Sequence, residues 1–254
     1  MVNFLKVKYN KNYMAGHSKW ANIKRKKEAE DKKRGKIFSK ISRMITLAVL
    51  AGGGITDPDK NVKLRLAVEK AKEANMPKEN IIRAIDRAKK PESSTLKEVI
   101  YEAFGPSGTA LMIEGSSDNP NRTLSEVRNV LSRFGGKLAT PGSVSHLFKR
   151  CGLLIIKKEK INEEKIFEIG ESLLAFDIDQ DSEAFYVYFP FENLGKVKEL
   201  LSPIQPDAVE IDYKPSTLIK ISDQQTGKTI LDLIESLENL DDIQKVYFNC
   251  DISL

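Results

Sequence analysis

The chain has 254 residues, of which 41% are hydrophobic and 30% are charged, and its net charge at pH 7 is +5. This length suits one large domain or two to three small ones, and the composition is typical of a soluble protein with real cores. The longest apolar run, Met44–Ile55, contains three consecutive glycines and is shorter than the roughly 18–20 residues that a membrane span needs. The composition therefore excludes a membrane-spanning protein.

The positive charge is concentrated at one end of the chain. Residues 1–90 hold 24 basic and 9 acidic residues, residues 91–150 hold 7 and 6, and residues 151–254 hold 10 and 21. A concentrated positive field attracts polyanions, of which nucleic acid is the commonest. This polarity predicts a molecule that turns its N-terminal end toward a polyanion and its acidic end away.

Residues 1–13 are basic, lack acids and precede a second methionine, Met14. We interpret them as a disordered extension or the result of an upstream start codon, with a short organelle-targeting segment as the alternative. That alternative would place the protein in a mitochondrion or another organelle. Cys151 and Cys250 have no CxxC partner, which predicts two buried, reduced thiols in a cytoplasmic protein.

Residues 14–92 are predicted to form a basic helical domain. Apolar residues recur at helical spacing over 35–51, 61–74 and 78–89. Acids are scarce before Arg43, so the ion pairs that support a merely solvated helix are missing, which favours phosphate binding. The only tryptophan would either stack on an unpaired base or anchor the N-terminal arm. The predicted nucleic-acid-binding residues are His17, Lys19, Trp20, Lys24, Arg25, Lys26, Lys27, Lys32, Lys33, Arg34, Lys36, Lys40 and Arg43.

The predicted fold class is α+β, with the helical bundle followed by two α/β domains of ferredoxin-like type. Residues 93–150 together with 216–254 are predicted to form one α/β domain, and residues 151–215 a second one inserted into it. The first includes a predicted strand at 143–148, and the second alternates β-α-β-α-β. The unit after Pro215 has too few elements to fold alone, so we expect it to complete the earlier sheet.

The polar segment Asp118–Thr123 predicts a turn and a helix cap, with Asn121 or Asp118 accepting backbone amides and Arg122 directed into a groove. The three glycines at 52–54 lack the ending of a P-loop. No Ser-His-Asp order, HExxH motif, metal-spaced cysteines or G-x-S-x-G appears. The sequence therefore predicts no catalytic residues, no metal and no cofactor, with a nuclease or a protein adaptor as remote alternatives.

Several separated motifs resemble the YebC family, in the family's order and over about Met14 to Ile252. They are Met14–Trp20, Arg34–Phe38, Asn75–Lys78, Asp118–Thr123, Thr140–Val144 and Leu240–Tyr247. The resemblance implies a helical N-terminal domain and two α/β domains, the last inserted into the middle one, with a groove between them. The chain departs from the family pattern at Pro120, which is extra, and in a short acidic loop at 177–181.

The resemblance also implies a regulator of gene expression that binds nucleic acid. Family members are named as DNA-binding transcriptional regulators, or are implicated at the ribosome in translation through proline-rich stretches. Dispersed lysines on short helices, without an evident helix-turn-helix recognition helix, suit structured RNA better than base edges. We therefore favour ribosomal RNA and the ribosome as partners, with DNA as the alternative. The sequence leaves the oligomeric state open and favours a monomer.

Overall fold

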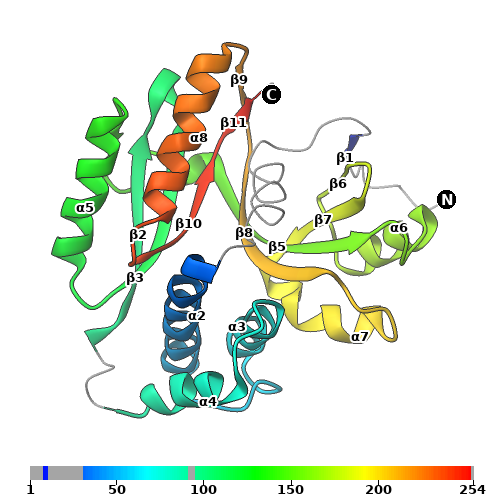
Figure 1. Cartoon of the computed structure of the whole chain (residues 1–254). Coiled ribbons are helices and arrows are strands. Elements are labelled where there is room, and N and C mark those ends of the chain that lie inside the picture. The colour runs from blue at the N-terminus through cyan, green and yellow to red at the C-terminus, as the bar shows by residue number, and fades with distance from the viewer. Residues whose placement is uncertain (1–7, 11–30, 91–94, 253–254) are drawn as a thin grey trace.

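The computed structural model describes residues 8–10, 31–90 and 95–252 (Figure 1). Its elements in chain order are β1 (Lys8–Asn10), α2 (Asp31–Ala51), α3 (Val62–Glu73), α4 (Lys78–Arg87), β2 (Lys97–Phe104), β3 (Ala110–Ser117), α5 (Pro120–Arg133), β4 (Lys137–Leu138), β5 (Phe148–Lys157), α6 (Glu163–Ser172), β6 (Asp177–Gln180), β7 (Ala184–Pro190), α7 (Val197–Leu201), β8 (Ala208–Pro215), β9 (Ile219–Ile221), α8 (Gln224–Glu238), β10 (Ile243–Phe248) and β11 (Cys250–Ile252).

The α+β class is confirmed, with a helical N-terminal part and two α/β parts, of which the second interrupts the first. We call them the helical unit (31–90), the middle unit (95–147 with 216–252) and the inserted unit (148–215). In Figure 1 the helical unit lies below the middle unit, with α3 beside the inserted unit.

In the helical unit, α2 packs against α3 and α4, as the apolar periodicity predicts. Ile45, Leu64 and Ala71 are fully buried between these helices. Asn61 caps α3, because its side-chain oxygen accepts the N–H of Leu64 at 3.1 Å. Its side-chain amide donates to the carbonyl of Ala48 at 2.9 Å. The residue that starts α3 therefore also fixes α3 to α2.

The middle unit contains a four-stranded antiparallel sheet in the order β10-β3-β2-β4. Helices α5 and α8 cover one face of it (Figure 1). Leu111 and Ile113 of β3 pack there against Val130 of α5 and Ile234 of α8. Strand β10 pairs with β3 although the inserted unit separates them in the sequence. The C-terminal segment thus completes the earlier sheet, as expected, and supplies one of its covering helices.

The inserted unit is an antiparallel sheet in the order β8-β5-β7-β6, covered on one face by α6 and α7. Its element order is β-α-β-β-α-β, the ferredoxin-like arrangement, so the predicted β-α-β-α-β order misses one strand. The missing strand is β6, which the sequence analysis treats as an acidic loop. Lys214 lies 2.9 Å from Asp177 and 2.8 Å from Asp179, and this pairing offsets the charge that favoured a solvated loop.

The predicted strand at 143–148 is wrong, because this stretch is a loop with one 3-10 turn and β5 begins at its end. Glu102 of β2 accepts the backbone N–H groups of Gly142, Val144 and Ser145 at 2.7, 2.5 and 2.9 Å. These donors are therefore occupied by a carboxylate and are not available to a neighbouring strand. Burial raises the pKa of Glu102, but the three backbone hydrogen bonds outweigh it and hold the pKa below its usual range.

Part of the predicted disordered extension is ordered. Residues 8–10 form β1, which pairs in parallel with β6 at the edge of the inserted sheet, with Lys8 opposite Asp177. The other residues of the extension lie outside the described residues.

Contacts join the helical unit to both of its neighbours. Val62 and Leu66 of α3 pack against the core of the inserted unit. Lys198 of the inserted unit lies 3.0 Å from Asp59, and Lys63 of α3 lies 3.7 Å from Glu98 at the edge of the middle sheet. The two apolar side chains of α3 therefore carry the packing, while the ion pairs lie at its rim.

We predict that a chain ending at Pro215 does not form the middle unit. The truncation removes α8 and β10, which supply Leu233, Ile234 and Phe248 to its core, and leaves one edge of β3 unpaired. In thermal melts followed by circular dichroism, the shortened chain should lose the cooperative transition of the middle unit. Adding residues 216–254 as a separate chain should restore part of it. A shortened chain with the full-length melting profile would contradict the discontinuous domain.

Candidate nucleic-acid interface

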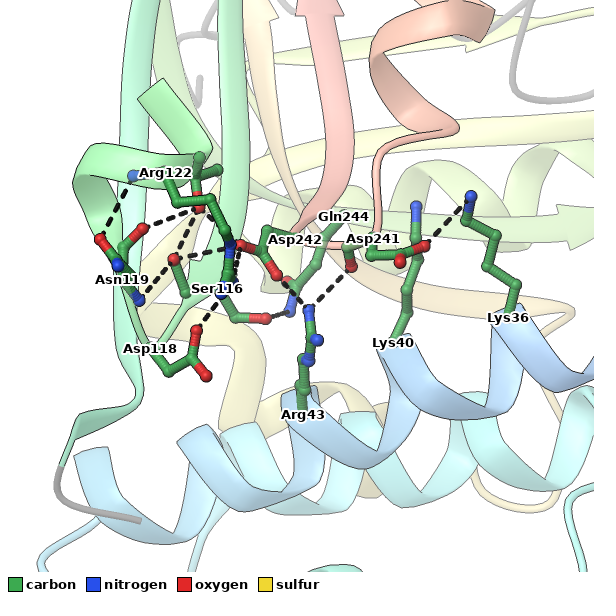
Figure 2. A network of polar contacts seen from close by, with 12 residues as sticks. Lys36, Lys40, Arg43, Ser116, Asp118, Asn119, Arg122, Asp241, Asp242 and Gln244 are labelled. Atoms are coloured by element: carbon green, nitrogen blue, oxygen red, sulfur yellow. Dashed lines mark hydrogen bonds and ion pairs between the residues drawn. The ribbon is translucent and has the colours of Figure 1, made fainter. Parts of the chain in front are cut away.

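Three of the predicted phosphate-binding residues lie together on one side of α2. Lys36, Lys40 and Arg43 follow each other at intervals of four and three residues, which places them on a single face of the helix. We call them the α2 cation row. Figure 2 shows that the row faces the connection between α8 and β10, residues 239–242, which we call the acidic turn.

The two lysines of the row hold the end of α8. Lys36 Nζ lies 3.1 Å from the Oδ1 atom of Asp241 and also donates to the carbonyl of Asn239. Lys40 donates to the carbonyl of Glu238. The last carbonyls of a helix have no partner within the helix and carry the negative end of its dipole. The lysines therefore satisfy the C-terminal end of α8 as well as an acidic side chain.

Arg43 makes the deepest contact of the row. Its Nη1 atom lies 2.5 Å from Oδ1 of Asp242 and 2.9 Å from the carbonyl oxygen of Asp241. The Asp242 side chain is only 3% exposed, whereas that of Arg43 is 29% exposed. The guanidinium thus reaches from a partly solvated position to a buried carboxylate.

The Asp242 carboxylate also receives donors from the middle unit. Its Oδ2 atom accepts from Thr123 Oγ1 at 2.6 Å, from Arg122 Nη2 at 2.8 Å and from Ser117 Oγ at 3.2 Å. Arg43 approaches the other oxygen, so the carboxylate is bonded on both sides (Figure 2). A buried carboxylate is tolerated only with such compensation.

The balance of these effects lowers the pKa of Asp242. Burial is the largest influence and raises the pKa, but the hydrogen bonds from Thr123 and Arg122 and the charges of Arg43 and Arg122 together outweigh it. The carboxylate therefore stays ionised at neutral pH, and its contacts stabilise the folded chain there.

The start of α5 presents Arg122 to this carboxylate. The N-cap residue is Asn119, whose side-chain oxygen accepts the N–H of Arg122 at 3.2 Å, so the predicted cap by Asn121 or Asp118 is wrong. Asp118 instead accepts from the Arg122 guanidinium at 2.8 Å. Arg122 therefore forms ion pairs with Asp118 and Asp242, two acidic side chains of the middle unit.

The backbone holds the acidic turn close to β3. The N–H of Ser116 donates to the carbonyl of Asp242 at 2.8 Å. A Cβ atom at Gly115 would lie 2.4 Å from the same carbonyl oxygen, so only glycine permits this approach without a shift of the backbone.

The structure brings some predicted site residues together and does not describe others. Lys36, Lys40 and Arg43 meet Arg122 around the acidic turn. Lys32, Lys33 and Arg34 belong to the first turn of α2, and their side chains lie outside the described part. The remaining predicted residues also lie outside the described residues, namely His17, Lys19, Trp20, Lys24, Arg25, Lys26 and Lys27.

Further exposed cations lie on α3 and just beyond its end. Lys70, Lys72 and Lys78 are exposed, and none of them forms an ion pair with another residue of the described chain. Lys70 and Lys72 are each exposed, but the predicted site ends at Arg43. Asp242 and Thr123 are not among the predicted site residues, although they lie within the motifs Leu240–Tyr247 and Asp118–Thr123. No local pattern pairs Arg43 with Asp242, because the two are 199 residues apart.

The described residues contain neither a metal-binding cluster nor a membrane-spanning helix. Histidine, cysteine, aspartate and glutamate side chains do not gather there in groups of three or more that could hold a metal ion. Among the described helices, none has the length and apolar character that crossing a membrane requires.

Comparison with known proteins matches two profiles of one family to nearly the whole chain. The profile described as the TACO1/YebC protein N-terminal domain matches residues 18–91, and the TACO1/YebC second and third domain matches residues 96–250.

Individual relatives match over the same extent. A "probable transcriptional regulatory protein" of Persephonella marina is 44% identical over 244 residues, which are 94% of this chain and 97% of the relative. The "probable transcriptional regulatory protein YebC" of Salmonella typhimurium is 46% identical at the same coverage. The crystal structure of a conserved hypothetical protein from Aquifex aeolicus superposes with a TM-score of 0.80 at 40% identity, covering 90% of this chain and 95% of that one.

We predict that Asp242→Ala lowers the free energy of unfolding by about 3 kcal/mol, the lower end of the range for breaking a buried pair, because Arg43 and Arg122 remain partly solvated. The pKa of Asp242 is lowered in the folded chain, so its contribution is present above about pH 4 and is lost as the pH falls through the folded-state pKa. In urea unfolding, the free energy of unfolding of Asp242→Asn should therefore fall furthest below that of the natural chain near neutral pH. In acid the two free energies should become equal.

The matched control for this series is Asp232→Asn, at an exposed position of α8. It should change the free energy of unfolding by less than about 0.5 kcal/mol, as expected of a surface site. An equal effect of the two substitutions would contradict the central role of Asp242.

Proposed function

Because the chain belongs to the TACO1/YebC family, we propose that it is a regulator of gene expression that acts by binding nucleic acid and not by catalysis. The observation that carries the proposal is the separation of charge, with 24 basic and 9 acidic residues in 1–90 against 10 and 21 in 151–254. Most of the described part of the first segment is the helical unit, at the lower end of the view in Figure 1, while residues 8–10 lie at the edge of the inserted unit. Such a charge distribution orients a protein on a polyanion.

The phosphate contacts come from two parts of the N-terminal segment. One is the basic run through Arg34, which includes His17 and Trp20, and the other is the exposed group Lys70, Lys72 and Lys78. Lysine and arginine that neutralise phosphates release condensed counterions, and this release supplies affinity that does not depend on sequence. The helical unit is therefore the part that docks first.

We further propose that the target is structured RNA at the ribosome, where the protein relieves stalled translation. In duplex DNA recognition, a helix-turn-helix protein inserts a helix with a free outer face into the major groove. The cation row of α2 faces the acidic turn of the same chain instead, and α4 spans only residues 78–87. Exposed lysines spread over α3 and α4, namely Lys70, Lys72 and Lys78, suit contacts to the backbone and shape of folded RNA.

The second candidate is a DNA-binding transcriptional regulator. The observation that favours it is that curated relatives 44% and 46% identical to this chain are named probable transcriptional regulatory proteins. Both candidates use the helical unit for phosphate contacts and differ in the nucleic acid that they engage.

We predict that Lys32→Glu combined with Arg34→Glu reduces nucleic-acid affinity at least about tenfold, because two phosphate contacts become repulsive. The measurement is fluorescence anisotropy with a labelled RNA hairpin at physiological salt. The control is Lys196→Glu with Lys228→Glu, an identical charge change at exposed positions outside the helical unit. Unchanged binding and unchanged activity in the first variant would favour a protein adaptor over a nucleic-acid reader.

We predict tighter binding to ribosomal RNA than to duplex DNA in gel shifts at physiological salt. The logarithm of the binding constant should fall linearly with the logarithm of salt concentration, by roughly 0.7 to 0.9 per phosphate for about 6–10 neutralised phosphates. Tighter, sequence-selective binding to the duplex would reject the ribosomal target and support the transcriptional one.

A further inference from the structure

The α2 cation row already binds an anionic surface within its own chain. We propose that the acidic turn, residues 239–242, competes with nucleic-acid phosphates for the α2 cation row, so that bound nucleic acid displaces the turn. The inference rests on the proposed function and adds the α2 cation row, once it is released from the turn, to the phosphate-binding residues of the helical unit.

The turn presents to the row the groups that a phosphate backbone would present. Lys36 and Arg43 meet the carboxylates of Asp241 and Asp242 at 3.1 and 2.5 Å. Carbonyls at the C-terminal end of α8 add partial negative charge along the same line. Arginine binds carboxylate and phosphate in the same way, so one set of cations serves either partner but not both at once.

The outer part of this contact is easily exchanged. In the pair between Lys36 and Asp241, the side chains are 41% and 75% exposed. An exposed ion pair of this kind contributes little stability and is screened by salt. A polyanion that brings many charges to the row can therefore replace the single carboxylate of Asp241.

The inner part of the contact can open without leaving a buried charge unpaired. When Arg43 leaves Asp242, the carboxylate keeps its bonds to Thr123, Arg122 and Ser117. Breaking a buried pair is strongly destabilising when it leaves an uncompensated charge, and here Arg122 still compensates the Asp242 carboxylate. The acidic turn therefore stays folded on the middle unit in both states, while the α2 row can bind either the turn or a phosphate.

This competition links nucleic-acid binding to the arrangement of the units. While the acidic turn holds the row, its three cations are not available to nucleic acid. The apparent affinity is therefore the intrinsic affinity multiplied by the fraction of molecules in which the row is free. Binding in turn weakens the attachment of α2 to the middle unit. The packing of α3 against the inserted unit through Val62 and Leu66 does not involve the row and should persist.

The test compares Asp241→Asn with Asp232→Asn in the full chain. Both remove one exposed acid at or near α8, but only Asp241 is paired with the row. With the labelled RNA hairpin, Asp241→Asn should bind about two- to fivefold more tightly than Asp232→Asn, the range expected from losing one exposed ion pair. Thermal melts should show that both variants remain folded.

Hydrogen exchange gives a second readout on the natural chain. Backbone amides of residues 239–242 should exchange faster when the hairpin is bound, while amides of β3 and β7 stay unchanged. Equal affinities of the two variants, or slower exchange of the turn on binding, would overturn the competition and leave the proposed function standing. If the natural chain binds neither the hairpin nor the matching DNA duplex, both the proposed function and the competition fail.

Discussion

The buried carboxylate of Asp242 holds together parts of the chain that are distant in sequence. Its donors come from α2, from the end of β3 and from the first turn of α5. Because a charge with this little exposure needs several compensating donors, each of these elements is fixed relative to the turn between α8 and β10. This side chain therefore joins the helical unit to the middle unit through Arg43.

The fold gives the basic residues of the N-terminal segment defined positions on the molecule. Apolar side chains of α3 fix the helical unit to the inserted unit, and the α2 cation row fixes it to the middle unit. The basic segment is therefore packed against the rest of the molecule from α2 onward. Its charges act from defined positions, some exposed on α3 and others held against the acidic turn. A charge count cannot distinguish these two groups, although they contribute differently to binding.

Local patterns predicted most of the fold. The apolar period of 3.6 residues identified α2, α3 and α4, and the short C-terminal unit was correctly expected to join the earlier sheet. Two of the errors, at β6 and at 143–148, have the same cause. The acids of β6 indicate a loop until they are paired with Lys214, which is distant in the sequence. Residues 143–148 indicate a strand, but the Glu102 carboxylate of β2 accepts backbone N–H groups of this stretch. In both places a distant side chain changed what the local residues favour.

The sequence by itself determined the family, the α+β class and the concentration of positive charge in the first 90 residues, because motifs, periodicity and charge are properties of neighbouring residues. Only the tertiary structure decided which cations are exposed and which are paired. Lys36, Lys40 and Arg43 look alike in the sequence to the lysines around them, yet they meet acids and carbonyls about 200 residues away. Electrostatic pairing depends on distance in space, and that distance is set only when the units pack together.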